Sequence, residues 1–108
     1  MSDPAPGTFR ARAERRPEGV VIVADGELDL VGAPALAAAL PEQGDTPVII
    51  DLAGVGFMDS SGLRALLEAR QACLEAGRPF AIARPSAAVR RVLELVDLAR
   101  EFEVVETL

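Results

Sequence analysis

The fold is decided by the stretch VIIDLAGVGFMDSSGLRALLEARQACLEAG, residues 48–77. It opens with an apolar, β-branched run that ends at Leu52, which is typical of a strand buried on both faces of a sheet. Two glycines then loosen the chain before a polar turn at residues 57–62, and a long helix begins there. The apolar positions of this helix recur at helical spacing and are expected to face the sheet: Leu63, Leu66, Leu67, Cys73 and Leu74. Gly77 follows the last turn and is expected to end the helix.

The sequence before this stretch predicts a β-hairpin. Residues 8–14 alternate apolar and polar side chains at the period of a half-buried strand, and their charged face suits an edge of the sheet. Turn residues at 16–19 and a β-branched run at 20–24 follow, so the two strands are expected to pair. Residues 1–7 carry no periodicity and are predicted to be a flexible N-terminal tail, so that one domain spans residues 8–108.

Further elements complete an alternating pattern. Pro34 starts a short helix through residue 40, and residues 80–83 form a short strand. Ser86 is expected to cap a third helix, and residues 102–105 are a final edge strand. The buried stripe of the third helix is predicted to be Val89, Val92, Leu93 and Val96. The order β-β-α-β-α-β-α-β predicts a single α/β domain with a mixed sheet of four to five strands and helices packed on it.

The composition excludes most mechanisms of hydrolases and of NTP-hydrolysing enzymes. Without any His, neither a Ser-His-Asp nor a Cys-His site can form, and without any Lys there is neither a Ser-Lys dyad nor a phosphate-binding P-loop. A single Cys and no His also exclude ordinary zinc sites, and no spacing of carboxylates supports a site for a hard cation. We therefore predict a protein that is not an enzyme, with no catalytic residue, no metal and no cofactor.

The charge and the apolar runs limit the partners and the location. The formal net charge of −6 repels phosphate backbones, so nucleic acid is not expected as a partner. No apolar run approaches the roughly 20 residues that a membrane span requires, and residues 1–7 lack the pattern of a signal peptide, so no membrane insertion is expected. Cys73 has no second Cys to pair with, which suits a reducing compartment. The expected location is the cytoplasm.

Two polar loops are expected to meet at one end of the sheet. Residues 25–32 follow one strand and residues 55–62 follow the next. In sheets of this type the functional crevice lies beyond the carboxyl ends of the strands. Asp29 and the turn Asp59-Ser60-Ser61-Gly62 are therefore expected to be neighbours.

Four segments carry a resemblance to a known family: Gly26-Glu27-Leu28-Asp29, residues 48–52, residues 57–63 and residues 85–93. In order and spacing they resemble the STAS family of anti-sigma factor antagonists. The resemblance spans residues 20–105, and the Asp-Ser-Ser-Gly turn before an amphipathic helix is its most specific element. The sequence departs from the family at Gly32, where members often carry Thr or Ser, which predicts a less well capped helix after it.

The resemblance implies a bacterial regulator of transcription that works by partner switching. The unphosphorylated antagonist binds an anti-sigma factor, which is also an ATP-dependent serine kinase, and thereby frees a sigma factor. The kinase inactivates the antagonist by phosphorylating the second Ser of the turn, here Ser61, and a metal-dependent serine phosphatase restores it. The residues predicted to bind the partner are Asp29, Glu27, Asp59, Ser60 and Gly62. The lack of a Cβ at Gly62 would let a kinase active site approach the Ser.

Each of these positions also has an interpretation within the fold alone. Ser60 or Ser61 can be merely the N-cap of the long helix, and Asp59 can cap the same turn. Glu27 and Asp29 can be solvent-facing loop residues. A phosphate on Ser61 would lie at a helix N-terminus, where free N–H groups and the helix dipole favour an anion. The domain would then tolerate the modification while the added charge disrupts a partner surface.

Two other functions stay open. A STAS domain can be a scaffold or a transporter-associated module in which the Ser is not cycled, for example the small cytoplasmic partner of a lipid-transport ATPase. A hydrolase that uses Ser61 is disfavoured, because a carboxylate alone seldom activates a serine. The sequence leaves the oligomeric state undecided.

Overall fold

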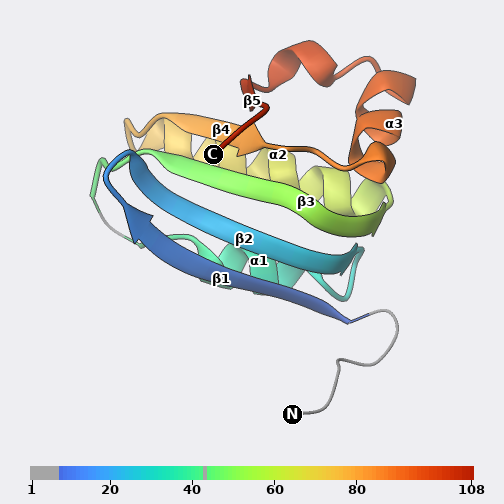
Figure 1. Cartoon of the computed structure of the whole chain (residues 1–108), viewed down its shortest axis with the longest axis horizontal. Coiled ribbons are helices and arrows are strands. Elements are labelled where there is room, and N and C mark those ends of the chain that lie inside the picture. Colours follow the sequence, from blue (N-terminus) through green and yellow to red (C-terminus); the bar gives the residue numbers. More distant parts are fainter. Residues whose placement is uncertain (1–7, 43) are drawn as a thin grey trace.

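A sheet of five strands forms the centre of the computed structural model, which describes residues 8–42 and 44–108 (Figure 1). The elements are β1 (Phe9–Arg16), β2 (Gly19–Leu28), α1 (Ala33–Ala39), β3 (Val48–Met58), α2 (Ser60–Glu75), β4 (Phe80–Ala83), α3 (Ala87–Leu95), the 3-10 helix η1 (Ala99–Glu101) and β5 (Val104–Val105). The strands lie in the order β1-β2-β3-β4-β5, with β1 antiparallel to β2 and the other pairs parallel. The predicted α/β fold and its mixed sheet are confirmed. The predicted tail at residues 1–7 lies outside the described residues.

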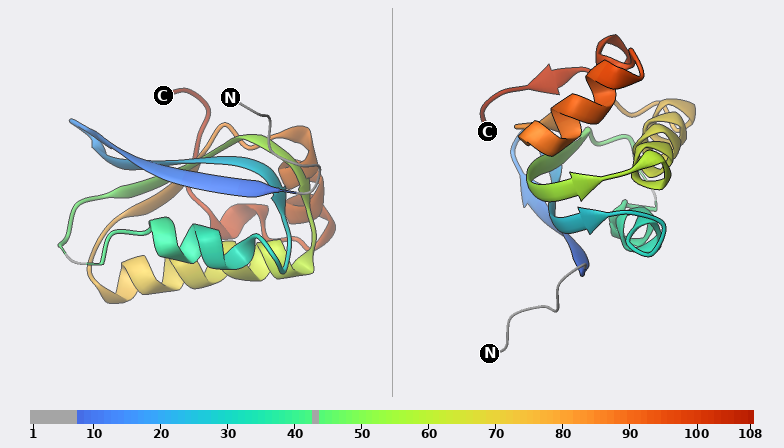
Figure 2. Two further views of the ribbon diagram at one scale, coloured as in Figure 1. Left: turned by 90° about the horizontal axis from the view of Figure 1, so that it is seen from below. Right: turned by 90° about the vertical axis from the view of Figure 1, so that its right-hand side faces the viewer.

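Helices α1 and α2 cover one face of the sheet, and α3 packs against β3 (Figures 1 and 2). An aliphatic core fills the space between the sheet and the helices. Its largest fully buried side chains include Ile22, Leu36, Ile50, Leu66 and Ile82. Burial of one such side chain stabilises a fold by about 1.5–3 kcal/mol, so this core fixes how α1 and α2 lie on the strands.

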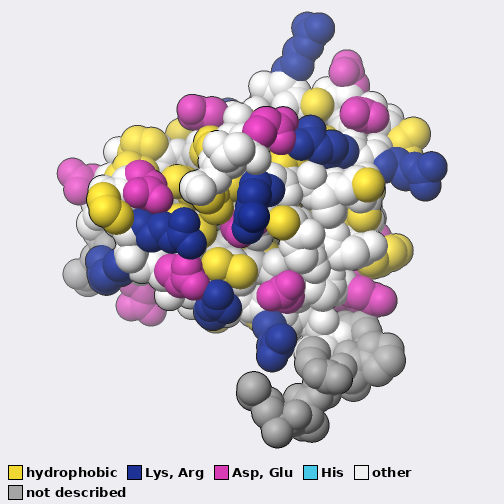
Figure 3. All heavy atoms as spheres, in the orientation of Figure 1, with side chains coloured by type: hydrophobic (Ala, Val, Ile, Leu, Met, Phe, Trp, Pro, Cys, Tyr) yellow, Lys and Arg dark blue, Asp and Glu magenta, His cyan; other side chains and the backbone are white. Residues whose placement is uncertain are grey.

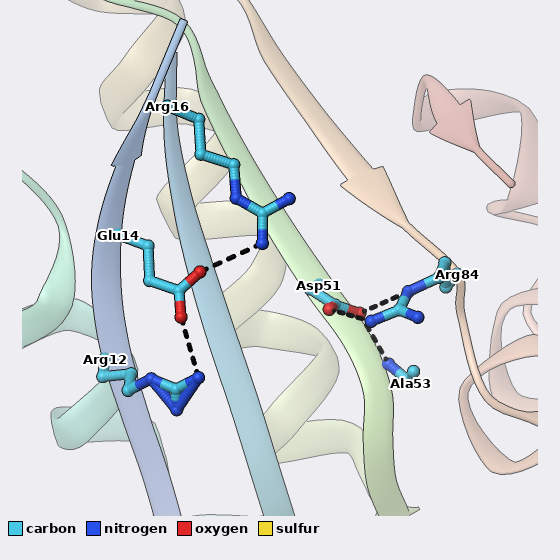
Figure 4. A network of polar contacts seen from close by, with 6 residues as sticks. All are labelled: Arg12, Glu14, Arg16, Asp51, Ala53 and Arg84. Atoms are coloured by element: carbon cyan, nitrogen blue, oxygen red, sulfur yellow. Dashed lines mark hydrogen bonds and ion pairs between the residues drawn. The ribbon is translucent and has the colours of Figure 1, made fainter. Parts of the chain in front are cut away.

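The other face of the sheet, which faces the viewer in Figures 1 and 3, carries interspersed basic and acidic side chains. On β1, Glu14 pairs with Arg12 at 2.8 Å and with Arg16 at 3.0 Å (Figure 4). On β3, Asp51 is only 4% exposed, and its carboxylate accepts hydrogen bonds from the guanidinium of Arg84. These hydrogen bonds and the charge of Asp51 raise the pKa of Arg84 above its ordinary value. The positive charge of Arg84 thus compensates the negative charge of the buried Asp51.

Strands β2 and β3 are longer than the sequence predicts. The expected ends were Ala24 and Leu52, whereas β2 runs to Leu28 and β3 to Met58. The register of this pair shifts at two places, so the glycines in both segments bend the strands instead of ending them. Leu28 lies opposite Met58, and the residues that follow the two strands are thereby brought together.

Helix α2 ends in a Schellman motif. Gly77 has a φ of 71°, its N–H donates to the carbonyl of Leu74, and the N–H of Arg78 donates to the carbonyl of Cys73. The prediction that Leu74 faces the sheet is wrong, since this side chain is 47% exposed and Ala69 is buried on that face. Cys73 is buried and free, as expected. Its burial raises the pKa of the thiol, although the charge of Arg78 opposes this.

The last third of the chain follows the predicted order: β4 has the predicted bounds, whereas α3 and β5 are shorter than expected. Ser86 caps α3, since its hydroxyl oxygen accepts a hydrogen bond from the N–H of Val89 at 3.3 Å. Val96 was expected in the buried stripe but lies just beyond the helix and is 46% exposed. Strand β5 is shorter than predicted, and the buried ring of Phe102 lies against Phe80, with 6.3 Å between the ring centroids.

Candidate functional site

The candidate site lies at the carboxyl ends of β2 and β3. Each strand is followed directly by an aspartate, Asp29 after β2 and Asp59 after β3. The backbone N–H of Asp59 points to the carbonyl of Leu28 at 3.5 Å, the last residue of β2. Asp29 follows Leu28 directly. The expectation that Asp29 and the Asp-Ser-Ser-Gly turn are neighbours is therefore confirmed.

Asp59 is the N-cap of α2. Its Oδ1 accepts a hydrogen bond from the N–H of Gly62 at 3.0 Å, and its carbonyl accepts one from the N–H of Leu63 at 3.0 Å. Ser60 and Ser61 therefore lie inside the first turn, and neither of them is the cap. Neither hydroxyl makes a hydrogen bond to another residue within 8–42 and 44–108. Ser60 is exposed and Ser61 is half-buried.

Asp29 closes a turn of the same kind. Its Oδ1 accepts a hydrogen bond from the N–H of Gly32 at 2.9 Å, and its carbonyl accepts one from the N–H of Ala33 at 2.9 Å. Asp29 is half-buried, so it is more than a solvent-facing loop residue. Glu27, the other acid predicted in this loop, belongs to β2 and lies opposite Phe57 of β3.

The two glycines of these turns are required by close packing. A Cβ on Gly62 would lie 2.0 Å from the carbonyl oxygen of Leu28. Gly62 is buried, so its missing side chain has a reason within the fold that does not involve access by a kinase. A Cβ on Gly32 would lie 2.7 Å from the Cβ of Phe9 and 2.9 Å from the carbonyl oxygen of Glu27. There is no space for the Thr or Ser that the family often carries at this position, and no side chain caps α1, so the prediction of a less well capped helix is confirmed. The side chain of Asp29 instead holds the turn before α1 through its hydrogen bond with the N–H of Gly32.

A groove of about 730 Å³ runs between α1 and α2, and the two serines line one end of it. Its lining residues are Leu30, Ala33, Pro34, Ala37 and Leu40 on the α1 side, and Ser60, Ser61, Arg64, Ala65, Glu68, Ala69 and Ala72 on α2. Most of this lining is apolar. The groove thus joins the turn at the start of α2 to a concave apolar surface.

Sequence reasoning missed two exposed apolar side chains in the turn before α1. Leu30 is 73% exposed and Val31 is 83% exposed, both in the turn after β2. Phe57, the last residue but one of β3, is also 46% exposed. The available signal was an adjacent Leu and Val inside a turn of otherwise polar or small residues, where no helical or strand period explains them. Of these three side chains, that of Leu30 also lines the groove.

Two possible features are absent from the described part of the chain. Among residues 8–42 and 44–108, no group of three or more His, Cys, Asp and Glu side chains could hold a metal ion. No helix among the same residues has the length and apolar character to span a membrane.

The model of the STAS domain family matches residues 10–108, and the chain belongs to this family. The resemblance deduced from the four sequence segments is thereby confirmed. The chain is also similar to the anti-sigma-F factor antagonist RsfB of Mycobacterium tuberculosis, with 33% identity over 94 residues that cover 83% of this chain and 76% of the relative.

Several solved structures share the fold. The crystal structure of an anti-sigma factor antagonist from Mycobacterium paratuberculosis superposes with a TM-score of 0.80 at 28% identity, and covers 96% of this chain and 91% of its own. The Bacillus cell fate determinant SpoIIAA in its phosphorylated form superposes with a TM-score of 0.59 at 23% identity, covering 92% of each chain. At that identity the second comparison shows the fold alone.

Proposed function

We propose that this chain is an anti-sigma factor antagonist that works as a phosphorylation switch. In its unphosphorylated form it binds an anti-sigma factor with serine kinase activity and so frees a sigma factor. The kinase then phosphorylates Ser61, the modified antagonist dissociates, and a metal-dependent serine phosphatase removes the phosphate. Two similar proteins are described as anti-sigma factor antagonists, and another protein of this fold has a structure in a phosphorylated form, which supports the proposal.

The observation that carries this proposal is that capping of α2 and the predicted phosphorylation fall on different residues of the Asp-Ser-Ser-Gly turn. The carboxylate of Asp59 caps the helix, and the hydroxyl of Ser61 makes no hydrogen bond to any other described residue. Transfer of the γ-phosphoryl group of ATP to the Ser61 oxygen therefore breaks no bond that holds the helix. A modification that leaves the fold intact can act through binding alone.

The charge that phosphorylation adds is large for this surface. A phosphoserine carries roughly −1.5 to −2 charges near neutral pH and three acceptor oxygens. At the first turn of α2 the free N–H groups and the helix dipole stabilise such an anion within the folded domain. A partner that binds the apolar surface around Leu30 and the groove would meet a solvated, doubly charged group at its edge. Its complex is expected to be destabilised.

The first test uses the unphosphorylated protein as bait in an extract of its own organism. The proposal expects a serine kinase of the anti-sigma factor class among the captured proteins. With ATP, the purified kinase should add one phosphate, and peptide mapping should locate it on Ser61. Phosphate found mainly on Ser60, Thr46 or Ser86 would contradict the assignment of the switch. Capture of only a transport ATPase would favour the alternative in which the Ser is not cycled.

Two substitutions of Ser61 then separate charge from fold. Ser61→Ala should bind the kinase with nearly the affinity of the wild type and should not be labelled. Ser61→Asp should bind at least about tenfold more weakly, a change of about 1.4 kcal/mol, because it places a permanent charge on the surface. Titration calorimetry with the captured kinase measures both affinities. Equal affinities of the wild type and both variants would rule out the switch.

A further inference from the structure

Arg64 lies where the predicted phosphorylation site meets the groove. It follows Ser61 by three residues on α2, and both side chains line the groove. Side chains with this spacing lie on one face of a helix, with about 5–6 Å between their Cβ atoms. Arg64 is exposed, and within residues 8–42 and 44–108 it makes no ion pair. By contrast, Arg84 and Arg90 are held by carboxylates.

Small side chains make up much of the walls of the groove. They line both sides: Ala33 and Ala37 on α1, and Ala65, Ala69 and Ala72 on α2. Two helices can pack closely where small residues form the contact, and a third helix often binds in the groove between two others. Helix α1 carries no charged residue, so charge on the walls of the groove comes from Arg64 and Glu68 on α2.

These charges decide which occupant fits. Glu68 lies one turn after Arg64 on the same wall, so the groove presents a positive and a negative charge in sequence. An anionic lipid would bring only the negative charge of its headgroup to this wall and to a protein of net charge −6. An amphipathic helix can place an acidic side chain against Arg64 and a basic or neutral one against Glu68 while it buries its apolar face.

We propose that the groove between α1 and α2 receives an amphipathic helix of the anti-sigma factor, that an acidic side chain of this helix pairs with Arg64, and that phosphate on Ser61 takes Arg64 away from it. This inference rests on the proposed function and adds the surface, the chemistry of the partner and the residue that senses the phosphate. An Arg guanidinium binds a phosphate group through two parallel hydrogen bonds, which a carboxylate must then displace. Phosphorylation thus removes the cationic anchor and leaves a charged group at the end of the groove.

The first experiment blocks the groove. Ala37 and Ala38 are adjacent, exposed residues of α1, and only Ala37 lines the groove. Ala37→Glu should weaken binding of the captured anti-sigma factor at least about tenfold, whereas Ala38→Glu should stay within about twofold of the wild type. Ala72→Glu repeats the test from α2 if the first variant does not fold.

The outcomes distinguish this inference from the proposed function. Binding that is equal in the two Ala variants overturns the groove while the function stands. A wild-type protein that captures no anti-sigma factor overturns both. If Ala37→Glu loses binding to vesicles of phosphatidylglycerol but still binds the anti-sigma factor, the groove is a lipid site and the inference is overturned. A self-association that only Ala37→Glu removes would assign it to a second copy, with the same consequence.

The second experiment tests Arg64 with and without the partner. Unphosphorylated Arg64→Gln should bind the anti-sigma factor about tenfold more weakly, and Arg91→Gln, on an exposed position of α3, should bind like the wild type. In protein carrying phosphoserine at position 61, phosphorus NMR should give the phosphate a higher second pKa in Arg64→Gln than in the wild type, because a cation beside the phosphate lowers that pKa. The same phosphate pKa in both, or unchanged affinity of unphosphorylated Arg64→Gln, would refute the role of Arg64.

Discussion

The turns that follow β2 and β3 have the same construction. Asp29-Leu30-Val31-Gly32 and Asp59-Ser60-Ser61-Gly62 both begin with an aspartate whose Oδ1 accepts a hydrogen bond from the glycine N–H, at 2.9 and 3.0 Å. In both, the aspartate carbonyl accepts a hydrogen bond from the N–H of the next residue after the glycine. Both glycines are buried against the backbone of β2 or a side chain of β1.

The two turns differ in their two middle residues. One turn presents an exposed Leu and Val, and the other presents two serines whose hydroxyls make no hydrogen bond to other described residues. The first and last residues of each turn are fixed by the fold, while the middle pair is free to serve binding. The comparison therefore assigns a role in stability to Asp and Gly, and leaves the proposed roles in binding and modification to the residues between them.

The largest effect on stability is expected at Gly62, the glycine of the turn that follows β3. Gly62→Ala would place a Cβ 2.0 Å from the carbonyl oxygen of Leu28, so the start of α2 must move, and we expect a loss of about 3 kcal/mol or more in the free energy of unfolding. Gly32→Ala should cost less, about 1–3 kcal/mol, because its nearest atoms lie at 2.7 and 2.9 Å. Urea denaturation measures both. Gly56→Ala is the control, since nothing lies within 4 Å of its Cβ position. Equal stabilities of the three variants would contradict the packing argument.

A smaller effect is expected at the two aspartates. Asp59→Ala and Asp29→Ala should each lower the free energy of unfolding by about 1 kcal/mol, because the first removes the side-chain cap of α2 and the second removes the hydrogen bond that holds the turn before α1. Asp29→Asn should keep most of this stability, since its amide oxygen can accept the same hydrogen bond while the charge is lost. Thermal melts check stability, and kinase affinity of Asp29→Asn then reports the charge alone. If Asp29→Asn binds like the wild type, Asp29 serves only the fold.

Much of the fold could be predicted because it depends on short-range patterns. The β-branched runs at residues 20–24 and 48–52, the turn before Gly19 and the cap at Ser86 all lie where the sequence places them. The full length of β2 and β3 could not be predicted, because glycines end strands in most contexts. Here pairing between the two long strands, with shifts of register, carries both past their glycines. That is a tertiary effect.

The chemistry of the site was less predictable than its position. Three consecutive residues, Asp59, Ser60 and Ser61, are all good N-caps, and only the backbone geometry shows that the aspartate fills this role. The burial of Gly62 against Leu28 depends on how α2 crosses the end of β2, which no local pattern contains. The roles predicted for Ser61 and for the partner-binding residues stay predictions.

The smallest effect on stability is expected at the two middle residues of each turn, which are the positions where the two turns differ. The double variant Leu30→Ser with Val31→Ser and the double variant Ser60→Ala with Ser61→Ala should each change the free energy of unfolding by no more than about 0.5 kcal/mol, because these side chains hold no cap.

Ser61→Asp should be neutral or stabilising by up to about 1 kcal/mol, since a negative charge in the first turn of α2 interacts favourably with the helix dipole. Parallel urea titrations of these variants and the wild type provide the test. A loss of 1 kcal/mol or more in the serine double variant would mean that a serine hydroxyl helps to hold α2, and phosphorylation of Ser61 could then no longer be separated from folding. If all the variants keep their stability, a change in partner affinity at either pair must come from the binding surface itself.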